Sequence, residues 1–207
     1  MNEILNWAKQ IQALAQNGLT YGKDKYDLQR YEELRTLAVE MMSTASGVKD
    51  HSVLRELFAN ETGYQTPKVD VRGVVFNSDN EILLVRELED SKWSLPGGWA
   101  DIGVSVKEMA AKEVEEESGY IVEPFKVLAV FDKKHHPHPP SPYHVYKIFI
   151  QCRSIQKAHE GDQIETDKIG FFNLENLPVL SEERVTESQL KILFNHATNP
   201  MRQTDFD

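Results

Sequence analysis

The chain has 207 residues, a formal net charge of −10 at pH 7 and a sequence pI near 5.2. This length predicts one catalytic domain with a smaller accessory segment, and the acidic charge argues against a protein that wraps nucleic acid with a basic surface. Cys152 is the only cysteine, which excludes an intrachain disulfide framework and a cysteine-based zinc cluster. No apolar stretch reaches the roughly 18 residues of a membrane-spanning helix, so we expect a cytoplasmic protein.

Three helices are predicted in the first 60 residues. In residues 4–14 the apolar side chains recur three and four positions apart, which predicts an amphipathic helix that ends at Gly18. A second helix is predicted over residues 24–44, with Asp24 as its N-cap. A third, short helix is predicted over residues 51–59.

The pattern of apolar residues changes after residues 60–67, which concentrate turn-forming residues and a proline. We therefore expect a helical N-terminal domain of residues 1–63 and a second domain of residues 64–207. The second domain opens with extended runs over residues 69–76 and 81–85, both rich in β-branched and aliphatic residues. The four polar residues between these runs predict a β-hairpin.

Further strands and one more helix are predicted later in the second domain. Extended runs cover residues 125–131, 144–152 and 169–172, and a last amphipathic helix covers residues 181–194. The first two of these runs flank a loop rich in proline and histidine. No internal repeat is present.

The most informative segment is a helix predicted over residues 105–118. Ser105 followed by Glu108 is a capping-box pattern, which marks the start of a helix. Gly119 suits the left-handed residue that closes a helix. Both ends of this helix are therefore well marked.

Three glutamates, Glu113, Glu116 and Glu117, continue the face that apolar residues begin in the first turns of this helix. Like charges at this spacing repel one another, and the helix macrodipole disfavours anions at the C-terminal end. A cation should therefore offset them, and hard oxygen ligands favour Mg²⁺ or Mn²⁺. The alternative is a solvated acidic face, which is what most glutamate runs form.

The stretch around this helix resembles the Nudix box, in which Gly, five residues, Glu, seven residues, Arg-Glu, an aliphatic residue, any residue, Glu-Glu, any residue and Gly follow one another. The matching positions are Gly98, Glu113, Val114, Glu116, Glu117 and Gly119, after the lead-in Leu95-Pro96-Gly97. Two positions depart: Val104 replaces the first glutamate, and Lys112 replaces the arginine. The resemblance extends to the N-terminal helices and residues 63–73, as in a bacterial subgroup that includes CDP-choline and ADP-ribose pyrophosphatases.

This resemblance implies an α+β fold class, with a Nudix-type mixed sheet sandwiched by helices and a small all-helical N-terminal domain. That domain would support the substrate site and a homodimer. The metal ligands would be Glu113, Glu116 and Glu117 with the carbonyl of Gly97, and the cofactor would be Mg²⁺ or Mn²⁺. The catalytic acids would be Glu116, Glu117 and Glu165, the last from a loop far along the chain.

Seven further residues are candidates for contact with the substrate. Arginine suits recognition of phosphate, tryptophan can stack on a base, and the histidine- and proline-rich loop could close over a ligand. The candidates are Arg72, Arg86, Trp93, Trp99, His135, His136 and Tyr143. The alternatives are a solvated arginine, a tryptophan packed in the core, and a histidine loop that only lies on the surface.

The leading hypothesis from the sequence is hydrolysis of CDP-choline to CMP and phosphocholine, with ADP-ribose as the main alternative substrate. Hydrolysis of RNA ends is a third possibility, which the acidic charge disfavours and a local metal would permit. A hypothesis of another class is a non-catalytic Nudix-fold nucleotide sensor, for which Val104 and Lys112 would be early signs of decay. The N-terminal helices could also be a protein-interaction module, although a homodimer interface explains their apolar stripes equally well.

Overall fold

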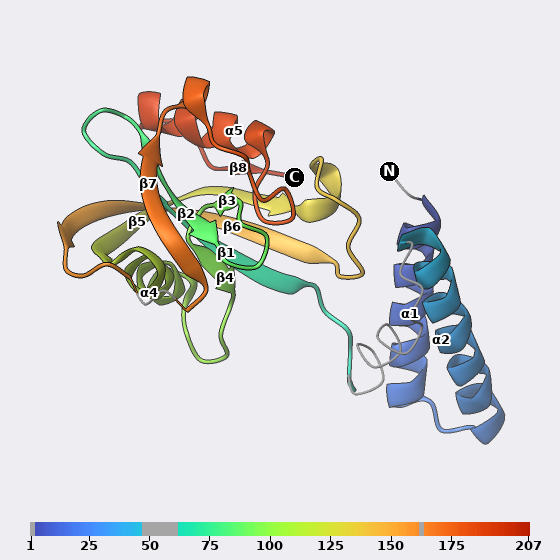
Figure 1. Ribbon diagram of the computed structural model, residues 1–207. Helices are drawn as coiled ribbons and strands as arrows, with labels where there is room; N and C mark the ends of the chain where they lie inside the picture. Colours follow the sequence, from blue (N-terminus) through green and yellow to red (C-terminus); the bar gives the residue numbers. More distant parts are fainter. Residues whose placement is uncertain (1–2, 47–61, 162–163) are drawn as a thin grey trace. The chain divides into compact units, whose positions relative to one another are not determined.

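The computed structural model describes three stretches of the chain, residues 3–46, 62–161 and 164–207. The chain divides into two compact units (Figure 1). The first comprises Met1–Pro67 and Pro140–His144, and the second comprises Lys68–Pro139 and Val145–Asp207. Among the described residues, no helix combines the length and the apolar character needed to cross a membrane.

The first unit contains a hairpin of two helices, α1 (Glu3–Tyr21) and α2 (Lys25–Ser46) (Figure 1). Its buried apolar cluster takes two residues from each helix: Leu5, Ala8, Val39 and Met42. Asp24 caps α2 as predicted, because its carboxylate accepts hydrogen bonds from the backbone N–H groups of Tyr26 and Asp27 at 2.9 and 3.1 Å.

The end predicted for the first helix is wrong, because α1 continues through Gly18 to Tyr21. A Cβ atom on Gly18 would lie 2.4 Å from the ring of Tyr31 on α2. The glycine therefore allows the two helices to approach closely and does not end the first one. The helix predicted over residues 51–59 lies outside the described residues.

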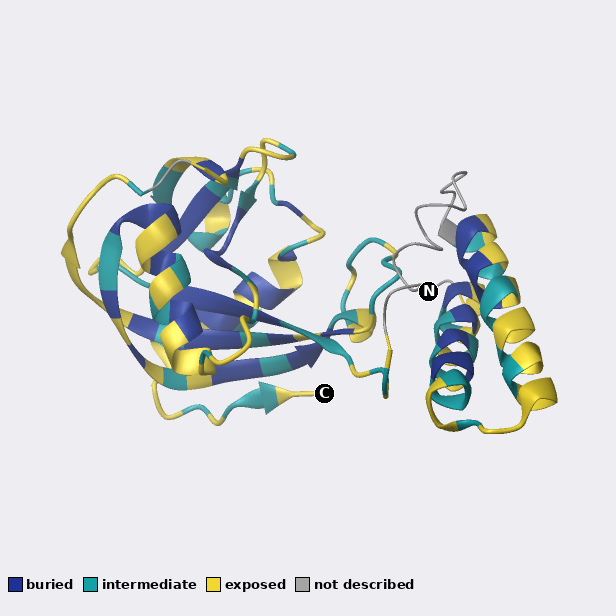
Figure 2. Cartoon of the chain, turned by 90° about the horizontal axis from the view of Figure 1, so that it is seen from below, coloured by how far each residue is buried: buried dark blue, intermediate teal, exposed yellow. Residues whose placement is uncertain are grey.

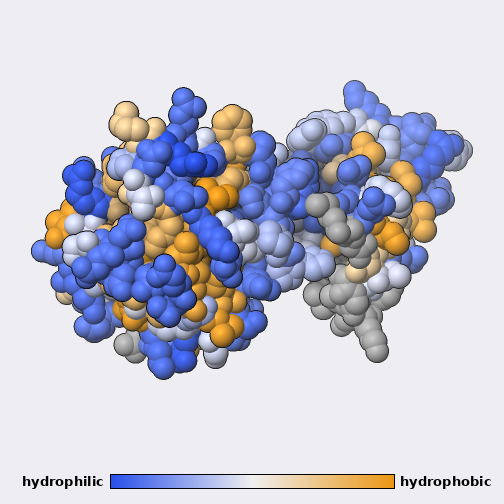
Figure 3. All heavy atoms as spheres, turned by 90° about the horizontal axis from the view of Figure 1, so that it is seen from above, coloured by the Kyte–Doolittle hydropathy of each residue, from blue (hydrophilic) through white to orange (hydrophobic). Residues whose placement is uncertain are grey.

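Large apolar side chains remain on the surface of α1. These are Ile4, Trp7, Leu14 and Tyr21, whose exposed fractions lie between 46 % and 67 %. Their spacing of three and seven residues places them on one face of the helix. Leu34 and Leu37 are similarly exposed on α2. Orange apolar residues interrupt the hydrophilic surface of this unit in Figure 3.

The second unit contains a larger sheet with the strand order β4-β1-β6-β5-β8 and a smaller one with the order β3-β2-β7. The larger sheet is mixed, because β1–β6 and β5–β8 are parallel while β1–β4 and β5–β6 are antiparallel. The strands are β1 (Lys68–Val75), β2 (Ile82–Glu87), β3 (Trp93–Ser94), β4 (Gly97–Trp99), β5 (Tyr120–Asp132), β6 (Val145–Lys157), β7 (Thr166–Phe172) and β8 (Asp205–Phe206).

Helices cover both faces of the larger sheet (Figure 1). On one face α4 (Val106–Ser118) shares a buried cluster with Val71 and Val75 of β1. On the other face α5 (Glu187–Thr198) shares a cluster with Val74, because successive side chains of a strand point to opposite faces. Figure 2 shows these strands mostly buried. The predicted α+β fold, with a mixed sheet between helices, is confirmed.

The hairpin predicted between residues 69–76 and 81–85 forms only at its turn. A tight turn joins the two strands, in which the N–H of Asn77 donates to the carbonyl of Glu81 at 3.0 Å. Their pairing stops at the bridge between Phe76 and Ile82. β1 continues in the larger sheet and β2 in the smaller one. A turn signal therefore located the strands correctly but did not identify their partners.

The last long helix begins later than predicted. Thr186 is its N-cap and forms a capping box with Gln189, so α5 starts at Glu187 and not at residue 181. The preceding residues form a turn in which the N–H of Val185 donates to the carbonyl of Ser181 at 2.9 Å. The described part of this unit also contains two short 3₁₀ helices, η1 (Lys133–His135) and η2 (Leu174–Asn176).

Candidate metal and active site

The acidic residues of the candidate site lie on the last turns of α4, whose ends are set by its sequence. The hydroxyl of Ser105 accepts from the N–H of Glu108, whose carboxylate accepts from the N–H of Ser105 at 3.0 Å, so the predicted capping box is present. Gly119 closes the helix with φ at 72°. A Cβ atom there would lie 1.9 Å from the carbonyl oxygen of His159, so the position also demands glycine sterically.

Gly97, at the start of β4, binds the end of α4 through its backbone. Its N–H donates to Oε1 of Glu117 at 3.0 Å. Its φ is 137°, and a Cβ atom would lie 2.1 Å from the carbonyl oxygen of Val71, so only glycine fits. A Cβ atom on the next residue, Gly98, would lie 3.6 Å from Oε2 of Glu113. This turn therefore brings backbone groups against two of the glutamates.

Glu117 buries a carboxyl group without satisfying it. Its side chain is among the buried ones, and Oε2 has no hydrogen-bond partner among the described residues. Burial raises the pKa of Glu117 to about 9, although the guanidinium of Arg72 acts in the opposite direction. Burial also raises the pKa of Glu113, and the two carboxyl groups influence each other. An unused carboxyl oxygen beside a second carboxyl group suits a hard divalent cation.

Glu116 differs from its two neighbours because it is exposed. Its Oε2 atom lies 3.9 Å from Nζ of Lys112. Within residues 3–46, 62–161 and 164–207, no three acidic, histidine or cysteine side chains come together as a group that could hold a metal ion. The structure therefore brings Glu113 and Glu117 together and leaves Glu116 at the surface.

Both departures from the box have local explanations. Lys112 donates to the carboxylate of Asp101 at 2.8 Å, which connects the loop after β4 to α4. This hydrogen bond is the largest cause that raises the pKa of Lys112. Val104 is partly buried and packs against the apolar cluster beneath α4. A lysine and a valine therefore make contacts within the protein at the two positions where the family pattern has arginine and glutamate.

Arg72, a candidate for substrate contact, is buried and uses its donors inside the protein. Its Nε and Nη2 atoms donate to the carboxylate of Asp70 at 3.0 and 2.8 Å. Its Nη1 atom donates to the carbonyl of Leu95 at 2.9 Å. Since Arg72 also lies opposite Gly97 in the sheet register, its side chain supports the turn that holds Glu117.

Arg86 and the two candidate tryptophans have different surroundings. Arg86 forms a forked ion pair with Asp167 of β7, with 2.7 Å between Nε and Oδ1. Trp93 packs edge to face on Phe172, with 4.8 Å between the ring centroids, and joins the apolar core. Trp99, at the end of β4, is 51 % exposed. Of the two rings, that of Trp99 is therefore the more accessible.

The candidate histidines lie beyond β5, the 13-residue strand that follows α4. His135 is exposed at the end of η1. A ring nitrogen of His136 lies 3.2 Å from the carboxylate of Asp207. Tyr143 belongs to the first unit, where its carbonyl accepts from Nζ of Lys9 at 3.1 Å. In the part of the chain that the structure describes, neither histidine forms a hydrogen bond or ion pair with the glutamates of α4.

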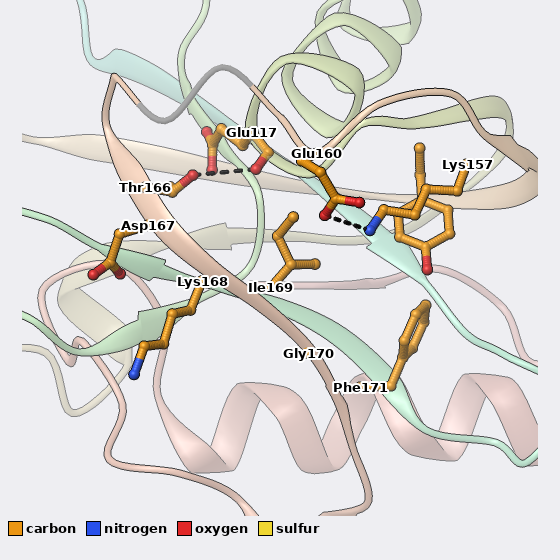
Figure 4. Close-up of a pocket in the computed structure, with 10 residues that line it drawn as sticks. Glu117, Lys157, Glu160, Thr166, Asp167, Lys168, Ile169, Gly170 and Phe171 are labelled. Carbon is orange, nitrogen blue, oxygen red and sulfur yellow. Dashed lines mark hydrogen bonds and ion pairs between the residues drawn. The ribbon is translucent and has the colours of Figure 1, made fainter.

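Glu165 precedes β7 and has an exposed side chain. Its carbonyl accepts from the N–H of Leu88 at 2.8 Å. The hydroxyl of the next residue, Thr166, donates to the carbonyl of Glu117 at 3.1 Å (Figure 4). The hydroxyl of Thr166 thus places the segment that carries Glu165 next to the end of α4.

A pocket of about 200 Å³ lies beside this contact (Figure 4). β7 forms one wall, and Glu117, Tyr120, Lys157 and Glu160 line the rest. Lys157 and Glu160 form an ion pair at 2.8 Å. The candidate site therefore borders a hollow with polar walls.

Sequence reasoning missed Asp70 and Lys147, the buried partners of Arg72. A signal for them was present in part. Asp70 and Arg72 alternate along β1 in phase with Val74, which faces the core, so two charged residues occupy inward positions of a strand. Such a pattern indicates a buried ion pair, because charged groups are rarely buried alone.

Two family models together match most of the chain. Residues 2–58 match the UDP-X-like, N-terminal oligomerisation domain, and residues 53–194 match the NUDIX domain. A putative ADP-ribose pyrophosphatase of Bacillus subtilis is 51 % identical over 203 residues, which are 98 % of this chain and 96 % of that protein.

Solved structures agree with these matches. An ADP-ribose pyrophosphatase of Streptococcus suis is 42 % identical with a TM-score of 0.62, and the match covers 69 % of this chain and 100 % of that one. A UDP-X diphosphatase is 31 % identical with a TM-score of 0.62, and the match covers 99 % of this chain and 98 % of that one. The chain therefore belongs to the Nudix family and is a Nudix pyrophosphatase that acts on a nucleoside diphosphate linked to another moiety.

Proposed function

We propose that a divalent cation, Mg²⁺ or Mn²⁺, binds between Glu113 and Glu117 and that ADP-ribose is the substrate. The observation that carries the metal site is the carboxyl group of Glu117, one oxygen of which is held by the N–H of Gly97 while the other has no described partner. A cation there would replace the proton that burial favours. The carbonyl of Gly97 and the carboxylate of Glu116 are the further ligands proposed.

When bound, the cation supplies neutralisation of the diphosphate and a lowered pKa of coordinated water. The chain itself positions the carboxylates. The N–H of Gly97 fixes the orientation of Glu117, and the buried guanidinium of Arg72 fixes the turn that carries Gly97. We propose that Glu116 or Glu165, both exposed, accepts the proton of the attacking water.

ADP-ribose has the most support as substrate. The relative with 51 % identity is named a putative ADP-ribose pyrophosphatase, and the solved structure with 42 % identity carries the name ADP-ribose pyrophosphatase. A solved structure that matches 99 % of this chain is named UDP-X diphosphatase, so UDP-linked compounds are the second candidates. CDP-choline stays a prediction from the sequence alone.

Among the candidate substrate contacts, the groups that solvent reaches are the better placed to contact a substrate. Trp99 could stack on a base, and Arg86 could exchange Asp167 for a phosphate. His135, His136 and Tyr143 remain proposals for a loop that contacts the distal part of the substrate. Arg72 and Trp93 are engaged within the protein, so we propose supporting roles for them.

The test is a product assay with Mg²⁺ or Mn²⁺ over ADP-ribose, UDP-glucose, CDP-choline and a short 5′-triphosphorylated RNA. Turnover of ADP-ribose to AMP and ribose 5-phosphate is expected, and Glu117→Gln should abolish it. If the protein hydrolyses another member of the panel and not ADP-ribose, that compound replaces ADP-ribose as the proposed substrate. Metal-dependent binding of ADP-ribose with no turnover of any compound would favour the non-catalytic sensor.

We also propose that the chain forms a homodimer through its first unit. The exposed apolar face of α1 formed by Ile4, Trp7, Leu14 and Tyr21 would be covered by a second copy. The match of residues 2–58 to an N-terminal oligomerisation domain supports this proposal.

A further inference from the structure

An exposed lysine of α4, Lys112, lies between two carboxylates. Its ammonium donates to Oδ2 of Asp101 at 2.8 Å, whereas Oε2 of Glu116 lies 3.9 Å from it, beyond hydrogen-bond distance. The hydrogen bond to Asp101 raises the pKa of Lys112 most, the charge of Glu116 comes next, and Glu113 has the smallest effect. Asp101 is therefore the residue that binds the ammonium, and Glu116 is the nearest alternative partner.

The position of Asp101 is set by the backbone of its loop, residues 100–105. The loop begins where the N–H of Ala100 donates to a carbonyl of β1 at 2.9 Å. Val104 packs into the apolar cluster beneath α4, and the capping box of Ser105 fixes the end of the loop. These contacts do not involve the carboxylate of Asp101, so its removal leaves both ends of the loop in place.

The side chain of Glu116 is available to either of two cations. In the described part of the chain its carboxylate accepts no hydrogen bond, and its ion-pair partner is Lys112. Glu116 lies four residues after Lys112 and three after Glu113, so it is a surface neighbour of both. An ammonium bound to Glu116 would therefore compete with a metal ion at Glu113 for the same carboxylate.

We propose that Asp101 is a positioning residue for the metal site, and this inference rests on the proposed function. By binding the ammonium of Lys112, Asp101 keeps it away from Glu116 and leaves that carboxylate free to bind the divalent cation. Asp101 also balances the positive charge of Lys112, which would otherwise repel a cation nearby. Asp101 does not touch the metal and acts only through Lys112.

The test is a double-variant cycle of Asp101→Ala and Lys112→Met. The dissociation constant of Mn²⁺ is measured by electron paramagnetic resonance on the full chain, without substrate, so the readout does not depend on turnover. Asp101→Ala/Lys107→Met is the matched control, because Lys107 is also exposed on α4 and its removal gives the same net charge. Thermal melts verify that each variant is folded.

We expect Asp101→Ala to raise the dissociation constant of Mn²⁺ about twofold to fivefold, which is the range of a typical exposed ion pair. Lys112→Met should bind Mn²⁺ at least as tightly as the wild type does. Asp101→Ala/Lys112→Met should match Lys112→Met, because Asp101 has no role once the ammonium is gone. Asp101→Ala/Lys107→Met should stay as weak as Asp101→Ala.

Three results would overturn the inference. One is an unchanged Mn²⁺ affinity in Asp101→Ala. Another is weaker binding in Asp101→Ala/Lys112→Met than in Lys112→Met, because Asp101 would then act through its own charge or through its loop. The third is full recovery in Asp101→Ala/Lys107→Met, because net charge alone would then explain the effect.

The wild type and Glu117→Gln separate a failure of this inference from a failure of the proposed function. If the wild type binds no Mn²⁺, or if Glu117→Gln binds it as tightly as the wild type does, the proposed metal site is wrong and the inference fails with it. If both controls behave as proposed, the cycle tests Asp101 alone.

Discussion

At the level of single residues, Glu117 offers the sharpest test, because one substitution separates its charge from its shape. In Glu117→Gln the amide oxygen can still accept the N–H of Gly97, but the negative charge that attracts a cation is lost. We expect the affinity for Mn²⁺ to fall by about tenfold or more and kcat by roughly a hundredfold or more. Electron paramagnetic resonance measures free Mn²⁺ directly.

At low pH the stability of this variant should change little. Because the pKa of Glu117 is raised to about 9, the folded protein keeps its proton without metal, and glutamine replaces a neutral acid of the same shape. In urea denaturation without metal below pH 4.5, where the unfolded chain keeps the proton too, we expect the free energy of unfolding to change by less than about 1 kcal/mol. Glu115→Gln, an exposed neighbour on α4, is the control for both measurements. Unaltered Mn²⁺ affinity in Glu117→Gln would contradict the proposed site.

The raised pKa of Glu117 also predicts a pH dependence of stability. Between its ordinary value of 4.5 and the raised value of about 9, the folded state keeps a proton that the unfolded state has lost. The contribution of this proton to the free energy of unfolding is complete below pH 4.5 and is lost as the pH rises toward 9. In EDTA, the melting temperature of Glu117→Gln should therefore rise relative to that of the wild type as the pH increases from 5 to 9. Parallel curves would mean that Glu117 titrates normally.

At the level of elements, the turn into β4 depends on a backbone conformation of Gly97 that residues other than glycine rarely adopt. In Gly97→Ala the new Cβ would meet the carbonyl oxygen of Val71 at 2.1 Å, and the turn would have to move away from Glu117. We expect a loss of about 3 kcal/mol or more in the free energy of unfolding, together with weaker Mn²⁺ binding. Denaturant titration and the Mn²⁺ assay check both effects.

Gly103 provides the matched control for this substitution. It also has a positive φ, 85°, but a Cβ atom there would meet nothing within 4 Å. Gly103→Ala should therefore cost only about 1 kcal/mol, from backbone strain alone, and should leave Mn²⁺ affinity intact. Equal losses of unfolding free energy and of Mn²⁺ affinity in Gly97→Ala and Gly103→Ala would show that steric contact at Gly97 is unimportant.

The elements that sequence predicted well carry their information locally. For α4, the capping pair Ser105 and Glu108 and the closing Gly119 lie within the helix or at its ends, and both boundaries are confirmed. Strand partners were not predictable in this way, because β1 pairs with a strand some 77 residues further along the chain. The same reason hid the buried ion pair of Lys147 with Asp70, because only the strand register places the two residues opposite each other.

At the level of the whole molecule, the chain joins a catalytic unit to a helical unit that exposes an apolar face. Apolar side chains of this size, repeated along one face of a helix, normally find cover in another protein surface. The catalytic residues proposed above all belong to the second unit. Association and catalysis can therefore be tested separately, by changing only the surface of α1.

The proposed homodimer makes a prediction that one charge on α1 can test. Leu14 is 67 % exposed in the middle of the apolar face, and Leu14→Glu would bury a charge in the interface. We expect the wild-type protein to sediment as a dimer of 23.7 kDa chains and Leu14→Glu as a monomer with intact secondary structure. Met201→Glu, at an equally apolar and 90 % exposed site of the second unit, should remain dimeric. A dimer that survives Leu14→Glu would place the interface elsewhere, because a buried glutamate costs several kcal/mol and no small rearrangement of α1 would hide it.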